Sequence, residues 1–243
     1  MTDEDRAEQP IQPGSSGSGL SGRTPRRPLD KALIVLEAVR FIDESGRELL
    51  TMRRLGARLG VEAMALYRYL PGREALLDAV VEALMDELYD ATMTGEYASS
   101  WQEYLQQLAH GVRALALAHP RIFPLVASRP PAAPWLRPPL RSLRWVEDFL
   151  TGLTHHGFND ADSVMAYRAF STFLLGHLLL ESASLSGEPL SPEDDGQPAA
   201  PGQDLSEYPL LLRLEVPLSQ SVYAEEFDDA LEDLIHRIEI ARS

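Results

Sequence analysis

The fold of this 243-residue chain is decided near its N-terminus, where residues 50–70 read LTMRRLGARLGVEAMALYRYL. Thr51 is a candidate helix N-cap, because its hydroxyl oxygen can accept a backbone N–H from the first helical turn. Gly60 suits the left-handed conformation that ends a helix, and a helical pattern resumes at Glu62. The stretch therefore predicts two short helices, over about 51–59 and 62–70, joined in a helix-turn-helix.

Side chains of this stretch have two predicted roles, a small core and a DNA-facing surface. The core residues are Leu55, Leu59, Val61, Leu66 and Leu70, and Gly56 is small enough to let the two helices approach closely. In a DNA-binding helix-turn-helix the start of the second helix enters the major groove. The residues there are Ala63, Met64 and Ala65. They offer few hydrogen bonds, so base recognition would depend on apolar contacts and on Arg53, whose guanidinium can bind guanine bidentately.

Hydroxyl and guanidinium groups that could reach phosphates follow in the sequence. They belong to Tyr67, Arg68, Tyr69 and Arg73. The alternative interpretation is a plain helical hairpin in an all-α protein, with its arginines in solvent. A short basic arm at residues 23–27 either enters the minor groove or is a solvated tail.

The charge distribution bears on this choice. The formal net charge of -15 by itself argues against a nucleic-acid partner. However, residues 21–75 carry a charge of +4, whereas residues 76–243 carry -16. The asymmetry predicts that the chain combines two functions, with most of the acidic residues outside the helix-turn-helix.

Composition excludes several classes of protein. The 44% hydrophobic content supports a core, and the absence of cysteine excludes disulfides, thiolate metal sites and a cysteine nucleophile. The longest apolar runs fall far below the roughly 20 residues of a membrane span. The N-terminus lacks the charged-then-apolar order of a secretory signal, so we expect a cytoplasmic protein without a membrane partner.

The rest of the chain shows a 3.6-residue apolar period and no strand-like alternation, which predicts an all-α fold. Further helices are expected over about 29–44, 73–92, 100–118, 140–156, 160–185 and 220–241. Residues 1–28 are rich in Ser, Gly and Pro and predict a disordered arm. The expected domains are a DNA-binding domain over 29–75 and a ligand-binding and dimerisation domain over 76–243, with a flexible linker at about 186–204.

Several segments resemble one family. Residues 50–78, which end in PGREALLD, resemble the DNA-binding domain of the tetracycline-repressor (TetR) family. SWQEYL at 100–105, SRP at 128–130, HGF at 156–158 and FLLG at 173–176 resemble, in order, landmarks of the tetracycline repressor's C-terminal domain. YPLL at 208–211 and the final helix fit its last segments.

The resemblance implies an Ω-shaped homodimer that binds double-stranded DNA. Each recognition helix would enter one major groove of a palindromic operator, and a small-molecule effector would release the repressor. The family's dimer interface is a four-helix bundle, here from the helices at about 160–185 and 220–241. Alternatively, these apolar faces pack only within one subunit.

The resemblance also locates a ligand pocket. The tetracycline repressor holds a magnesium–drug chelate with histidines and an asparagine, at positions that here are Tyr89, Leu108 and Leu125. Leucine has no donor atom for Mg²⁺, and no two histidines have the i, i+4 spacing of a helical metal site, so we expect neither a metal nor a cofactor. The candidate lining suits a hydrophobic or aromatic effector and consists of Leu108, Val112, Leu125, Ser128, Trp145, Phe149, Thr172 and Phe173. Each could instead be an ordinary core residue, and Trp135 either covers the pocket or anchors its loop.

Two other functions remain open at this point. One is an all-α small-molecule-binding protein whose N-terminal domain does not read DNA sequence. The other is an interaction module with a filled core and no ligand. Catalysis finds little support, because no nucleophile elbow, Gly-rich phosphate loop or paired-carboxylate motif is present, and we expect no enzyme activity.

Overall fold

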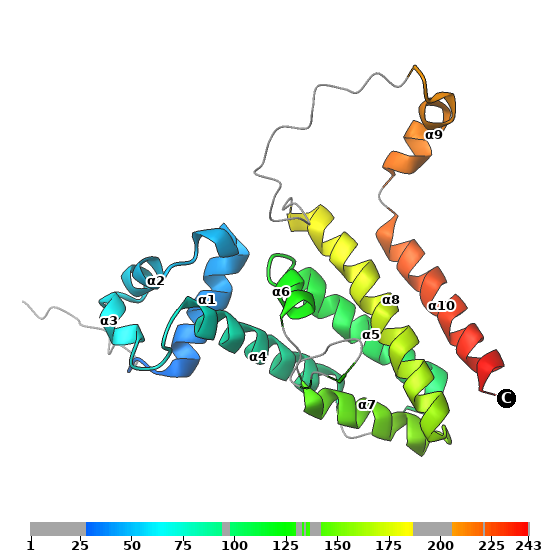
Figure 1. The fold of residues 1–243 in the computed structure, drawn as a ribbon, viewed down its shortest axis with the longest axis horizontal. Helices are drawn as coiled ribbons and strands as arrows, with labels where there is room; N and C mark the ends of the chain where they lie inside the picture. Colours follow the sequence, from blue (N-terminus) through cyan, green and yellow to red (C-terminus); the bar gives the residue numbers. More distant parts are fainter. Residues whose placement is uncertain are drawn as a thin grey trace, which may run out of the picture.

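The computed structural model describes residues 28–93, 98–129, 133, 135–136, 142–186, 206–220 and 222–242. These residues form ten α-helices and one 3-10 helix, without a strand among them, which confirms the predicted all-α fold. Figure 1 shows a head made by α1 to α3, a body made by α5 to α8 and α10, and α4 running between them. The basic arm lies outside the described residues, as does the predicted linker beyond Ser186.

The head begins with α1 (Lys31–Ser45), η1 (Arg47–Leu49) and α2 (Met52–Leu59). The side chain of Asp30 caps α1 by accepting from the N–H of Leu33 at 2.7 Å. Thr51 caps α2 in the predicted way, since its hydroxyl oxygen lies 3.2 Å from the backbone nitrogen of Arg54. Gly60 closes α2 with a φ of 69°, which confirms the predicted left-handed turn.

The second helix of the motif is shorter than predicted. α3 (Ala63–Leu66) covers only the start of the predicted 62–70 segment, and a turn follows it. The N–H of Tyr69 bonds to the carbonyl of Leu66 at 3.0 Å, the i to i−3 pattern of a tightened last turn. The N–H of Leu70 also bonds to the carbonyl of Leu66 at 3.1 Å, and Pro71 then prevents the helix from continuing, because a residue that precedes proline avoids the helical conformation.

The longer helices match their predicted ranges to within three residues. They are α1 and, beyond the head, α4 (Arg73–Thr92), α5 (Trp101–Ala118), α7 (Leu143–His155), α8 (Asp160–Ser186) and α10 (Tyr223–Ala241). α4 packs on α1 in the head and on α5 in the body. It is therefore the element that connects the DNA-binding motif with the body's core.

α8 is the central helix of the body. By length and composition it is the one described helix that could cross a membrane. It packs against α5, α6, α7 and α10, and an apolar composition is typical of a helix surrounded by others. At its side, Phe149 of α7 stacks on Trp145 and Phe170 with ring centroids 5.4 and 5.3 Å away.

Two helices were not predicted, α6 (Phe123–Ser128) and α9 (Pro209–Ser219). α6 spans only six residues, too few for a period to show. α9 contains Pro217 and buries none of its side chains, so its helical pattern has no apolar face turned to a core. In Figure 1 it stands away from the body.

Candidate nucleic-acid interface and ligand cavity

The turn between α2 and α3 fixes the start of the recognition helix. The N–H of Val61 donates to the carbonyl of Gly56 at 2.9 Å. A Cβ at Gly56 would lie 2.9 Å from the carbonyl oxygen of Val61 and 3.2 Å from the nitrogen of Ala63, so the predicted close approach is confirmed. Of the predicted core residues, the buried ones are Leu55, Leu66 and Leu70. The partly buried ones are Leu59 and Val61.

The residues expected to face DNA are exposed or half-buried in the head. Met64 is 71% exposed, Ala63 and Ala65 are half-buried, and Tyr67 is 44% exposed. Arg53 and Arg68 are exposed, and no described residue forms an ion pair or hydrogen bond with either guanidinium. Both cations therefore remain available for an anionic partner.

Two of the predicted phosphate-binding residues are already engaged within the head. Arg73 donates from Nε to the carbonyl of Leu50 at 3.0 Å and from Nη2 to the carbonyl of Arg47 at 2.8 Å. The hydroxyl of Tyr69 donates to the carbonyl of Leu29 at 2.7 Å. That Arg73 binds a phosphate stays a prediction, with two of its guanidinium nitrogens already hydrogen-bonded to backbone carbonyls inside the head.

Two arginines of α2 that the sequence did not single out also hold the head together. Arg58 chelates the carboxylate of Glu44 at 2.6 and 2.8 Å and also binds Glu37, so α2 is tied to α1. These carboxylates raise the pKa of Arg58, and its guanidinium lowers the pKa of Glu44. Arg54 donates to the carbonyl of Leu49 at 3.1 Å. The tertiary structure thus distinguishes arginines that bind within the head, such as Arg54 and Arg58, from the exposed Arg53 and Arg68.

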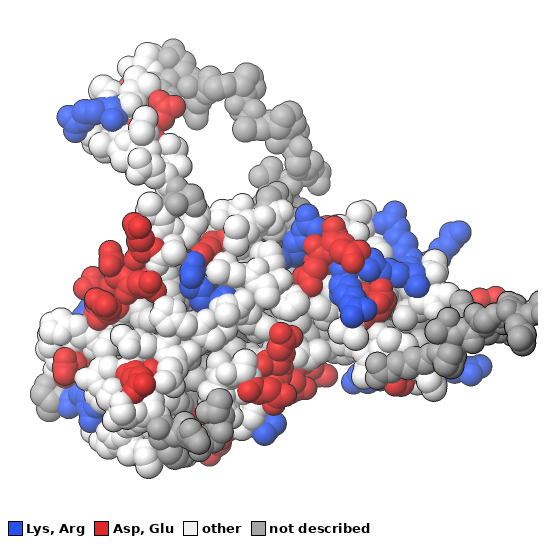
Figure 2. All heavy atoms as spheres, turned by 180° about the vertical axis from the view of Figure 1, so that it is seen from behind, with Lys and Arg blue, Asp and Glu red and all other residues white. Residues whose placement is uncertain are grey.

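Charge is distributed over the surface as the sequence predicted in outline. Figure 2 shows Lys and Arg side chains gathered over the head, mixed with a few carboxylates. Acidic side chains dominate the exposed side of α10 at the opposite end. A polyanion would therefore be attracted to the head and repelled by the far end of the body.

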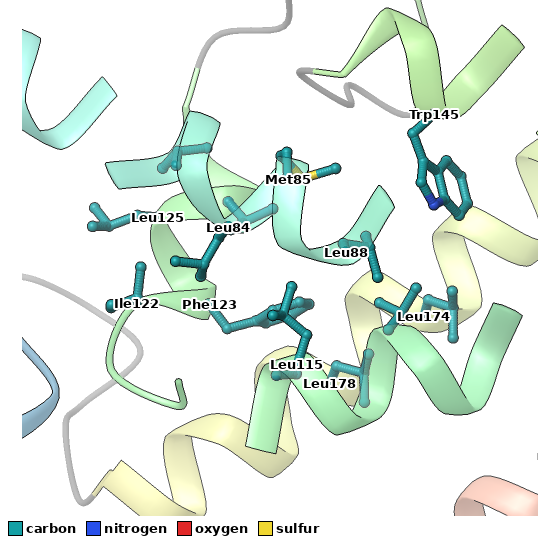
Figure 3. Packing of buried hydrophobic residues seen from close by; sticks show 14 of the residues in the cluster. Leu84, Met85, Leu88, Leu115, Ile122, Phe123, Leu125, Trp145, Leu174 and Leu178 are labelled. Atoms are coloured by element: carbon teal, nitrogen blue, oxygen red, sulfur yellow. The ribbon is translucent and has the colours of Figure 1, made fainter. Parts of the chain in front are cut away.

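A small apolar cavity lies in the body between α4 and the helices around it. Its volume is about 30 Å³. Figure 3 shows Leu88, Phe123 and Leu174 converging on this region from α4, α6 and α8. Apart from Ser171 the lining is apolar: Met85, Leu88, Val112, Leu115, Phe123, Val126, Trp145, Leu174 and Leu175. Drug-sized ligands occupy pockets of roughly 300–1,000 Å³, so such a ligand would have to move these walls apart.

The structure distributes the eight predicted ligand residues over three places. Val112 and Trp145 line the cavity. Leu108, Leu125 and Phe149 are buried in the surrounding core, and in Figure 3 Leu125 lies on the other side of α6.

The remaining three lie away from the cavity. Ser128 is exposed at the end of α6, and Thr172 and Phe173 line an open groove of about 640 Å³ between α8 and α10. The structure does not bring these three to the cavity, because their helix faces point elsewhere. Trp135 is 78% exposed.

The sequence missed the contributions of α4 and α6 to the cavity. Met85 and Leu88 come from the apolar face of α4, and Phe123 and Val126 from α6. The helical period of α4 was the available signal, whereas nothing local marked the six-residue α6.

The positions at which the tetracycline repressor holds its chelate do not fit a magnesium site here. Leu108 and Leu125 are buried and apolar. The hydroxyl of Tyr89 donates to a carboxylate oxygen of Asp148, while Arg144 lies 3.5 Å above the ring. The bond to Asp148 raises the pKa of Tyr89, which keeps the phenol neutral. Among the described residues no three His, Asp or Glu side chains group to hold a metal ion.

Comparison with known proteins agrees with this architecture. The family model for bacterial regulatory proteins of the tetR family matches residues 34–80, and that for the tetracyclin repressor-like C-terminal domain matches residues 95–240. The tetracycline repressor protein class D of Escherichia coli is 30% identical over 218 residues, which cover 87% of this chain and 90% of that protein.

Solved structures show the same relationship. A possible TetR family transcriptional regulator from Streptomyces coelicolor A3(2) has a TM-score of 0.67 and 29% identity, over 88% of this chain and 100% of that one. TetR-Q116A from Acinetobacter baumannii AYE, in complex with minocycline, has a TM-score of 0.63 and 26% identity, over 89% and 99% of the two chains. The chain belongs to the TetR family and is a ligand-responsive, DNA-binding transcriptional regulator with a C-terminal domain of the tetracycline-repressor type.

Proposed function

We propose that this chain is a homodimeric repressor that binds a palindromic operator and is released from it by a small hydrophobic or aromatic molecule. One observation carries the proposal: α4 packs on α1 in the head, and further along the same helix Met85 and Leu88 line the cavity. A molecule that separates the cavity walls would displace α4 and, with it, the head. Repression as the direction of control is supported by the tetracycline repressor relatives.

In this proposal the exposed side of the head binds DNA. Arg53 donates to a guanine, the start of α3 meets base edges, and Tyr67 and Arg68 contact phosphates. Two heads of a dimer would match half-sites separated by about one DNA turn, roughly 34–36 Å.

Exposed apolar side chains support a second subunit. α9 presents a series of them without burying any, namely Leu210, Leu211, Leu212, Leu214, Val216 and Leu218. On α8, Leu180 and Leu185 are more than half exposed. Large exposed apolar surfaces mark interaction sites, and a bundle of α8 and α10 from two subunits would cover the exposed leucines of α8.

The effector is proposed from the chemistry of the cavity. An almost wholly apolar lining favours a neutral hydrophobic or aromatic molecule over a metal chelate. Binding that favours a different separation of the heads lowers operator affinity by about 1–3 kcal/mol in typical allosteric proteins. We further propose that the protein works in the cytoplasm and has no enzyme activity.

The test is a mobility shift with DNA from the region upstream of the chain's own gene. Retardation at low salt and its reversal by an apolar aromatic compound are expected. The double substitution Arg53→Ala with Tyr67→Phe should abolish retardation and leave effector binding intact. If no upstream fragment is retarded while compounds still bind, the chain is a small-molecule-binding protein that does not read DNA.

A further inference from the structure

The start of the recognition helix carries an exposed apolar side chain, in a motif that also contains two exposed arginines. Met64 is 71% exposed, and the neighbouring Ala63 and Ala65 are half-buried. None of these three side chains has a hydrogen-bond donor or a strong acceptor. The hydrogen bond from the N–H of Val61 to the carbonyl of Gly56 fixes the turn before this helix, and with it the position of the Met64 backbone.

The cations of the helix-turn-helix indicate which partner covers Met64. Arg53 and Arg68 are exposed, and no described residue pairs with either of them. A partner that brings negative charge to these cations and an apolar edge to the methionine fits both features. DNA does so, because phosphates border a major groove that contains thymine methyl groups.

The chemistry of the major groove then limits what Met64 can distinguish. The four base-pair orientations differ there in donors, acceptors and the 5-methyl group of thymine. A side chain without hydrogen-bonding groups discriminates in favour of a base only through the methyl group. Methionine suits this contact, because its flexible and polarizable thioether adapts to an apolar surface.

We propose that Met64 reads the 5-methyl group of a thymine in each operator half-site, while Arg53 supplies the hydrogen-bonded contact. Met64 is thereby a specificity-determining residue, and the ligand of this face is thymine-containing duplex DNA. The inference rests on the proposed function as an operator-binding protein.

The experiment removes the methyl groups from the DNA. Full-length protein is used to select binding duplexes from a random pool, and each thymine of the selected half-site is then replaced by deoxyuridine. A buried methyl group corresponds to roughly fourfold in affinity, and thus to about fifteenfold when both half-sites are changed. We expect a loss of this size at one or two thymines, and none at thymines outside the half-sites.

Two variants assign the effect to the side chain. In Met64→Ala the wild-type preference for thymine over deoxyuridine should disappear, although the head keeps its thermal stability because the residue is exposed. In Met64→Gln the selected sequence should shift toward adenine, since an amide binds adenine bidentately. Tyr67→Phe is the matched control, which should weaken binding to both DNAs equally.

The outcomes separate this inference from the function on which it rests. Operator binding that is unaffected by deoxyuridine at every position overturns the inference and leaves the repressor intact. A deoxyuridine effect that persists in Met64→Ala also overturns it, because another residue then reads the methyl group. Failure to select any duplex overturns the proposed function itself.

Discussion

The imidazole of His119, at the end of α5, lies with its Nδ1 2.8 Å from Oδ2 of Asp43 in α1. Arg121 strengthens this connection between body and head by donating to the backbone carbonyl of Asp43 at 2.9 Å. Glu87 of α4 faces the other ring nitrogen at 3.9 Å. The junction therefore joins α1, α4 and the segment before the cavity-lining α6 through charged groups.

This junction predicts a pH-dependent stability. The hydrogen bond to Asp43 is the main reason why the pKa of His119 is raised above its ordinary value of 6.5. Because the pKa of His119 is higher in the folded state than in the unfolded state, protonation of this residue stabilises the fold. The stabilisation is complete below the unfolded-state pKa and is lost as the pH rises through the folded-state pKa. Replacing His119 by Asn should therefore reduce the free energy of unfolding most at pH 5.5–6, roughly, and least near pH 9.

Denaturant unfolding of both proteins across that range measures the effect. Asp43→Asn should remove most of the same pH dependence, because it removes the negative charge that favours the protonated imidazole. Curves for wild type and His119→Asn that run parallel at all pH values would show that the pair carries no linked proton.

A buried ion pair joins α5 and α8. It predicts that replacing one partner lowers the free energy of unfolding much more than replacing both partners. Arg113 binds both carboxylate oxygens of Glu181 at 3.0 and 2.5 Å, and the side chain of Glu181 is only 5% exposed. Removing one partner leaves a buried charge, so Arg113→Met should cost about 3–5 kcal/mol. Adding Glu181→Leu should recover much of that loss, as measured by urea unfolding, and equal losses in the single and double variants would contradict this account.

The contact at Gly56 predicts a defect confined to the head. In Gly56→Ala the new Cβ would lie 2.9 Å from the carbonyl oxygen of Val61. Backbone atoms cannot easily move away from such a clash, so we expect the substitution to destabilise the fold by about 1–3 kcal/mol. We expect weaker operator binding and earlier thermal unfolding. Gly72→Ala is the matched control, because its Cβ would meet nothing within 4 Å. Equal effects of the two substitutions would refute a steric role for Gly56.

The replacement of the chelate positions predicts indifference to magnesium and tetracycline. Leu108 and Leu125 offer no donor atoms, and Tyr89 is held by Asp148 beneath Arg144. Tetracycline with Mg²⁺ should neither raise the melting temperature nor release DNA, and EDTA should change neither property. Apolar aromatic compounds should give a melting-temperature increase that grows with concentration. A Mg²⁺-dependent increase with tetracycline would sink this prediction.

Local chemistry explains what the sequence by itself determined. Thr51 and Gly60 mark the ends of α2 through hydrogen bonds and a backbone conformation that involve neighbours only a few residues away. The range of α4 follows in the same way from Gly72 and from an apolar period of about 3.6 residues that continues over twenty residues. The motif, the helix content and the placement of acidity outside the head needed no long-range contact to be predicted.

Tertiary structure alone decided which side chains are free to act. Arg53 and Arg73 look alike in the sequence, yet Arg73 is taken up by a carbonyl 23 residues away, at Leu50. Likewise, Val112 lines the cavity, whereas Phe173 lines the groove between α8 and α10. Which of the two sites a side chain lines depends on how its helix is rotated against the neighbouring helices. Such contacts join segments that are far apart in the chain. A helical period in the sequence predicts which face of a helix is apolar, but it does not predict which other element packs against that face.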